Sequence, residues 1–93
     1  MKESKVECVF RVDETGQEYE GVAMLLEYNY GNYQFWFGAA NILLPNGKMQ
    51  LSSPGTIKIE DGRTGKFHFN GFKIVKTYGE IGFIGVSPLV QEE

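Results

Sequence analysis

The chain has 93 residues, of which 42% are hydrophobic and 14% aromatic, and its formal net charge is −3. This length suits one small domain, and the apolar share supports a packed core, which disfavours a disordered chain. The charge is not the large basic excess that is typical of nucleic-acid binders, although residues 56–76 are locally basic.

No apolar run approaches the length of about 18 residues that a membrane span needs. Residues 1–6 lack the apolar segment of a signal peptide, and the single cysteine, Cys8, can form no disulfide within the chain. We therefore expect a cytoplasmic protein that does not contact a membrane.

The first predicted strand covers residues 5–13, where apolar and polar side chains alternate. A period of two is typical of a strand that is buried on one side. Its inward positions are Val6, Cys8, Phe10 and Val12, so Cys8 is expected to be a small buried residue. Residues 13–17 are rich in turn formers, and Gly16 is the expected left-handed position.

The pairing of this strand with the next one is open to two interpretations. Pairing Phe10 with Val22 and Cys8 with Met24 aligns the apolar faces. The same pairing places two acidic residues on the inward parity, namely Glu18 and Glu20. Either these two lie beyond the core, or Gly21 carries a β-bulge.

The most specific local signal is a β-hairpin over residues 22–38 that turns at Gly31-Asn32. Glycine accepts a positive φ without steric cost, and Gly followed by Asn suits a type II′ turn. The register then pairs Tyr30 with Tyr33, Tyr28 with Phe35, Leu26 with Phe37 and Met24 with Ala39. We expect this nearly apolar face to pack into the core and the opposite, half-polar face to point outward.

After the hairpin the apolar pattern changes parity. Ile42 and Leu44 lie on even positions, whereas the expected inward aromatic residues lie on odd ones, which predicts a bulge or bend over residues 38–41. A second two-residue turn is predicted at Asn46-Gly47, and it would pair Leu44 with Met49.

The second half of the chain is predicted to contain three further strand signals. Residues 56–60 alternate as a strand, and Asn70-Gly71 is expected to turn a third hairpin that pairs Phe69 with Phe72. Residues 81–86 form a short strand that its glycines should bend strongly.

These elements define an all-β chain, because strand patterns recur every eight to twelve residues and no helical period is present. We expect a single domain over residues 1–93, with residues 1–4 and 88–93 as loose ends. The favoured architecture is a small antiparallel barrel of six to seven short strands joined by tight Gly/Asn turns, since closure removes exposed edges. A two-sheet β-sandwich is the alternative.

No catalytic constellation is found. Residues 60–67 and 79–85 contain glycines, but they lack the spacing of a phosphate-binding loop or of a dinucleotide fingerprint. Cys8 and His68 are expected on opposite sides of the sheet. The carboxylates that could serve as an acid and a base are Glu18, Glu20 and Glu27. No spacing brings two of them together, so we expect no enzyme, no metal site and no cofactor.

Two surfaces are candidates for binding. The first is the outward face of the central hairpin, where a tryptophan among polar neighbours is typical of a protein-contact patch. Its residues are Leu25, Glu27, Asn29, Gln34 and Trp36. The alternative is that a second sheet or barrel wall covers this face, which would make Trp36 a core residue.

The second surface is a basic face that could bind anions. Its residues are Arg63, Lys66, His68 and Lys73. Such side chains hold phosphates in many proteins, but they also keep a strand edge soluble.

The sequence favours a small non-catalytic module, of adaptor or inhibitor type, that binds a protein partner, which is either another chain or a second copy. The alternative from another class is a barrel that binds nucleotides, oligonucleotides or other anions with the basic face and stacks bases on aromatic side chains. A third hypothesis is an enzyme with an unrecognised carboxylate site.

Overall fold

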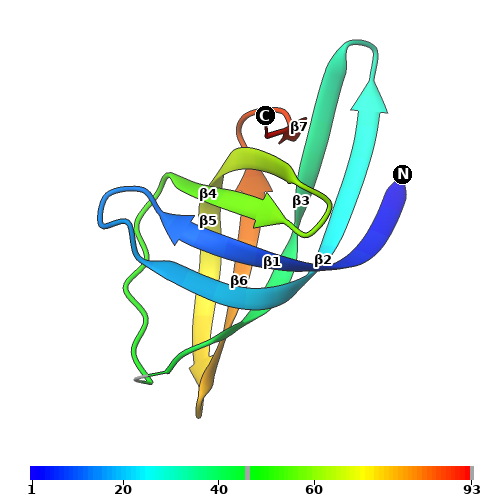
Figure 1. The fold of residues 1–93 in the computed structure, drawn as a ribbon. Coiled ribbons are helices and arrows are strands. Elements are labelled where there is room, and N and C mark those ends of the chain that lie inside the picture. The colour runs from blue at the N-terminus through cyan, green and yellow to red at the C-terminus, as the bar shows by residue number, and fades with distance from the viewer. Residues whose placement is uncertain (46, 93) are drawn as a thin grey trace.

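A computed structural model describes residues 1–45 and 47–92, and these residues contain seven strands (Figure 1). The prediction of an all-β chain is confirmed. The strands are β1 (Lys2–Val12), β2 (Glu18–Tyr30), β3 (Tyr33–Leu43), β4 (Gly55–Ile59), β5 (Arg63–Val75), β6 (Tyr78–Gly85) and β7 (Val90–Gln91). Within the described residues there is no helix of the length and apolarity that crossing a bilayer would require.

All seven strands belong to one antiparallel sheet whose hydrogen bonds close in a ring. The order is β4-β1-β2-β3-β6-β5-β7, and β4 also pairs with β5. The ring therefore contains six strands, and β7 lies beside β5 at one end. The alternative of two separate packed sheets does not describe these pairings.

The central hairpin has the predicted turn and register. Gly31 has a φ of 61°, and Asn32 is not among the residues with positive φ, as a type II′ turn requires. The cross-strand partners are Tyr30–Tyr33, Tyr28–Phe35, Leu26–Phe37 and Met24–Ala39.

The predicted direction of the hairpin's two faces is wrong. Trp36 is only 2% exposed and Leu25 is fully buried, so the face expected outside forms part of the core. Tyr28 and Phe35, on the face expected inside, are exposed. Both faces carry large apolar side chains, so residues 22–38 taken by themselves do not decide which face the ring encloses.

The pairing of β1 with β2 shows where the prediction failed. Phe10 pairs with Tyr19 and Cys8 with Gly21, three residues away from the expected partners. The register runs through Gly21 without a bulge. In this register Glu18 and Glu20 face solvent together with Val22 and Met24, which removes the conflict between charge and parity.

The predicted bulge over residues 38–41 is also absent from β3. The β2–β3 register continues unbroken from Tyr33 to Ile42. Because Trp36 is the inward residue, Ala40, Ile42 and Leu44 share its parity and all four are buried. No change of face is needed.

Two other predicted turns differ from the structure. Asn70-Gly71 does not turn the chain, because β5 continues to Val75 with only a bulge between Phe69 and Gly71, and Phe69 pairs with Phe83 of β6 instead of Phe72. The actual turn follows at Lys76, which has a φ of 58°.

A two-residue turn is also predicted at Asn46-Gly47, but Asn46 lies outside the described residues. The described residues 47–54 form no strand, so the expected pairing of Leu44 with Met49 is not present. Gly47 donates its backbone N–H to the carbonyl of Leu44 at 2.9 Å.

Both ends of the chain carry more structure than predicted. Residues 2–4 pair with residues 25–27 of β2. Near the other end Leu89 is buried, and β7 pairs with Arg63 and Thr64. Glu93 lies outside the described residues.

The core fills the space that the ring encloses. Phe10, Phe67 and Phe83 are fully buried and meet at ring-centroid distances of 5.4–6.0 Å. Trp36 completes this group, with its centroid 6.1 Å from that of Phe83. Cys8 is buried at the same side of β1, as predicted.

Candidate functional site

The residues predicted to form a partner-binding patch do not form an open surface. Leu25, Glu27 and Trp36 are buried within the chain, and the indole N–H of Trp36 donates to the carbonyl of Ser87 at 2.6 Å. Gln34 is half-buried, while Asn29 is exposed. The expectation that these five side chains present a common outward face is therefore wrong, and the alternative, in which Trp36 is a core residue, is the one observed.

Glu27 is buried because it pairs with a cation from β5. The guanidinium of Arg63 donates to both carboxylate oxygens of Glu27, at 2.5 and 3.2 Å, and its Nε donates to Asp61 at 2.9 Å. The hydrogen bond to Glu27 is the main cause that raises the pKa of Arg63. Burial raises the pKa of Asp61, but the hydrogen bonds from Arg63 outweigh it and lower that pKa overall.

The four residues of the predicted anion-binding face are not brought together as free cations. Arg63 is used by Glu27 and Asp61. Lys66 pairs with Asp13 at 2.6 Å and also donates to the hydroxyl of Thr56 at 2.8 Å.

The other two members lie further along β5. His68 is exposed opposite Ile84, and Lys73 is exposed opposite Glu80. Arg63, Lys66 and Lys73 therefore each have an acidic group of this chain as a bonded or cross-strand neighbour, which weakens the case for an anion site.

The strongest unexplained feature is on the opposite face of the hairpin. Five aromatic side chains there are between 38% and 73% exposed. We call this set the aromatic face, and it consists of Tyr28, Tyr30, Tyr33, Phe35 and Phe37. Tyr28 and Phe35 stack across the strands at 5.1 Å with an interplanar angle of 18°. The rings therefore form a joined surface and not scattered exposed residues.

The aromatic face lies partly on a projecting ribbon. Pairing of β1 with β2 ends at Glu27, and pairing of β6 with β3 begins at Phe37, so residues 28–35 pair only with each other. Figure 1 shows this end of β2 and β3 extending beyond the rest of the sheet. Such a ribbon presents its outer rings with few neighbours from its own chain.

The inner side of the ribbon is held by the segment after β6. The backbone N–H of Leu89 donates to the side-chain oxygen of Gln34 at 2.9 Å, and Trp36 is bonded to Ser87. This packing fixes which side of the ribbon points inward. It thereby holds the aromatic face toward solvent.

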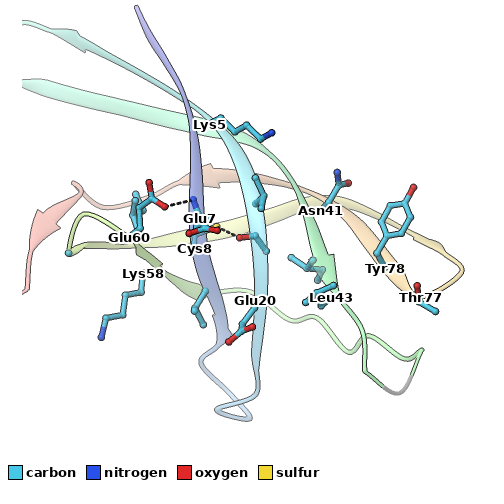
Figure 2. A pocket seen from close by; sticks show the side chains of 16 residues that line it. Lys5, Glu7, Cys8, Glu20, Asn41, Leu43, Lys58, Glu60, Thr77 and Tyr78 are labelled. Atoms are coloured by element: carbon cyan, nitrogen blue, oxygen red, sulfur yellow. Dashed lines mark hydrogen bonds between the residues drawn. The ribbon is translucent and has the colours of Figure 1, made fainter.

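A hollow on the outer surface brings together several charged side chains (Figure 2). We call it the charged hollow, and its charged residues are Lys5, Glu7, Glu20, Lys58 and Glu60. Glu60 accepts the backbone N–H of Glu7 at 3.1 Å, and Lys58 pairs with Glu92 at 3.2 Å. The hollow therefore mixes both signs, and two of its charged groups already have partners.

The residues considered for catalysis are placed apart. Glu18 and Glu20 face outward, whereas Glu27 is buried on the inner side with Arg63. Burial raises the pKa of the Cys8 thiol to about 12, and its S–H donates weakly to the carbonyl of Gly21 at 3.7 Å. Among the residues with described positions, no group of three His, Cys, Asp or Glu could hold a metal ion.

Sequence reasoning assigned the aromatic face to the core, although one signal pointed the other way. Glu18 and Glu20 share the parity of Val22 and Met24 on the same strand, and charged side chains mark a solvent face more reliably than aromatic ones. Following that parity along β2 would have turned Tyr28 outward.

The chain matches no protein-family model, and comparison with curated proteins and with solved structures finds no significant similarity.

Proposed function

We propose that the chain is a small non-catalytic protein-interaction module, of adaptor or inhibitor type, which holds its partner on the aromatic face. One observation carries this proposal, namely that five neighbouring aromatic side chains are exposed on one side of a hairpin. Aromatic side chains are enriched among the residues that dominate binding energy in protein interfaces.

The exposed area supports the same function. Taking about 200 Å² for a fully exposed ring, the exposed fractions of the five rings sum to about 500 Å². A contiguous apolar patch on a typical monomer reaches about 300–600 Å², and the largest patches are often functional. Three exposed apolar side chains on the same outer side extend this patch, namely Met24, Ile84 and Val86.

In this proposal the ring of strands is a small β-barrel. It acts as a rigid scaffold from which the hairpin projects. The inner contacts of Trp36 and Gln34 support this role, since they tie the ribbon to the segment after β6. A cytoplasmic location is part of the proposal. The buried thiol of Cys8, the single cysteine of the chain, suits a reducing compartment.

The module is proposed to be non-catalytic because Cys8 and Glu27, two side chains considered for catalysis, are poorly placed for it. A thiol whose pKa is raised to about 12 is protonated at neutral pH, so Cys8 is a poor nucleophile. Glu27 is held by two hydrogen bonds from Arg63. Both side chains are buried, so neither is open to a substrate.

The proposal is tested by purifying the chain from its own cells in low salt and identifying what travels with it by mass spectrometry. The wild type is compared with the double variant Tyr30→Ser/Tyr33→Ser, which alters two exposed rings. Leu43→Ser is the matched control, because Leu43 is 60% exposed on the outer side of β3 but lies outside the aromatic face.

We expect the wild type and the control to purify with a protein partner, which is either another chain or a second copy of this one seen as a doubled complex mass, and we expect the double variant to lose it. Copurification of a nucleotide or nucleic acid, released steeply as salt rises, would overturn the proposal in favour of an anion-binding function. A protein partner that the double variant retains would show that another surface is used.

A further inference from the structure

The outer surface of the hairpin changes from large to small side chains along its length. The registers of β2 with β3 and of β3 with β6 define four successive rows on this surface. From the tip downward the rows are Tyr30 and Tyr33; Tyr28 and Phe35; Leu26, Phe37 and Ile84; Met24, Ala39 and Gly82. The tip rings are the most exposed of the four rows, at 73% and 71%, and the fourth row leaves space above Ala39.

This space is a second hollow in the outer surface. We call it the small-residue hollow. Its lining includes Met24, Ala39, Asn41, Lys73, Glu80 and Gly82, together with the exposed side chains of Lys5, Val22 and Phe72. The side-chain oxygen of Asn70 lies over Gly82 and so fills part of the hollow at that position. The hollow is thus apolar at Met24, Ala39, Val22 and Phe72, and polar at Asn41, Lys73 and Glu80.

We propose that the occupant of the aromatic face is a second copy of this chain, packed face to face with its hairpin running in the opposite direction. This inference rests on the proposed function and names its partner. The two-fold axis would lie perpendicular to the strands, level with the Glu27–Trp36 pair. Each tip then reaches the small-residue hollow of the other copy.

The symmetry follows from the row order. Rotation about this axis places Tyr33 of one copy over Ala39 of the other, and Tyr30 over Met24. It also places Tyr28 over Leu26, and Phe35 over Phe37. A two-fold interface requires one surface to carry both members of each contact, and an axis at this level pairs the tip rings with the fourth row.

The chemistry of the rings agrees with their positions. The tip carries tyrosines: the hydroxyl of Tyr33 would meet the polar groups of Asn41 and Glu80, and that of Tyr30 would lie near Lys5, which pairs with Met24. The middle rows carry Phe35 and Phe37, which have no polar atom to satisfy against the apolar rows of the other copy.

The area is sufficient for a specific dimer. The five rings of each copy supply about 500 of the roughly 800 Å² that each partner contributes to a standard interface. The third and fourth rows add Leu26, Ile84 and Met24, of which Ile84 and Met24 are 48% and 40% exposed.

The test is sedimentation velocity of the full chain from about 1 µM to about 500 µM, a range that covers micromolar dissociation constants. We expect a monomer–dimer equilibrium in the wild type. Tyr33→Ala and Ala39→Tyr should each weaken it by at least about tenfold, since one removes the projecting ring and the other fills the hollow. Leu43→Ser should leave it unchanged.

The double variant Tyr33→Ala/Ala39→Tyr decides the orientation. In the proposed dimer the exchanged residues still face each other, so the dimer should return to within about threefold of wild-type affinity. Both positions are exposed, and circular dichroism with urea midpoints checks that all variants fold.

A wild type that stays monomeric at the highest concentration overturns the inference. A dimer that the single variants do not weaken, or that the exchange does not restore, overturns it as well. If the monomer instead captures a different protein through Tyr30 and Tyr33, the inference fails while the proposed function stands. A monomer without any such partner refutes both.

Discussion

The contact between Trp36 and Gly85 makes Gly85→Ala a direct test of the core geometry. An added Cβ at Gly85 would overlap the indole atoms Cε2, Cδ2 and Nε1 of Trp36. The ring has little room to retreat, because a Cβ at Gly65 would already lie 2.8 Å from its Cζ2 atom. The indole N–H is also bonded to Ser87.

The expected cost follows from these contacts. Overpacking a core costs about 1–3 kcal/mol, and a displaced indole would also lose its hydrogen bond, worth about 1 kcal/mol. We expect Gly85→Ala to lower the free energy of unfolding by about 3 kcal/mol. A chain of 93 residues has about 5–14 kcal/mol in total, and the melting temperature should fall by roughly 12–24 °C.

The assay is urea and thermal unfolding followed by circular dichroism, with Trp36→Phe as the second arm of a double-mutant cycle. The smaller ring of phenylalanine leaves space above Gly85, so Gly85→Ala should cost less than half as much in that background. An equal cost in both backgrounds would refute the reasoning. The reasoning would also be refuted if Gly85→Ala left the free energy of unfolding unchanged in the background that keeps Trp36.

Three further predictions concern the charged and titratable groups. Glu27→Gln should lower the free energy of unfolding, measured by urea denaturation, by about 2–3 kcal/mol, because Arg63 keeps its charge but loses its main partner. The double variant Glu27→Gln/Arg63→Gln should recover part of the lost stability, and a Glu27→Gln variant as stable as the wild type would contradict this prediction. Burial raises the pKa of Asp13, but the bonds from Lys66 and Thr56 outweigh it and lower that pKa below 3.8. The stability from this carboxylate is present above its unfolded pKa and is lost as the pH falls through the folded one. Unfolding free energy should therefore fall between about pH 5 and about pH 2, and less steeply in Asp13→Asn, whereas identical slopes would argue against the pair. Finally, because the pKa of Cys8 is raised to about 12, a thiol reagent at about pH 8 should label native protein at least about a hundredfold more slowly than urea-unfolded protein. Equal labelling rates would place the thiol at the surface.

The sequence by itself determined the local structure of this protein where the chemistry is local. Alternation of apolar and polar residues indicates strands because side chains of a strand alternate between two faces. Gly31 specifies a turn with positive φ, and that turn fixes the register of Tyr28 with Phe35. These decisions involve residues close together in the chain, so they can be read without knowledge of the fold.

Only the tertiary structure decided which face of the hairpin is inside. Trp36 is buried because Gly65 and Gly85 leave a flat space for its ring and Ser87 accepts its N–H, and these residues lie 29 or more positions away in the sequence. Arg63 reaches Glu27 across 36 positions and makes a buried carboxylate stable. Because such partners come together only when the ring closes, the tertiary structure decides that the aromatic residues of the other face are left to solvent.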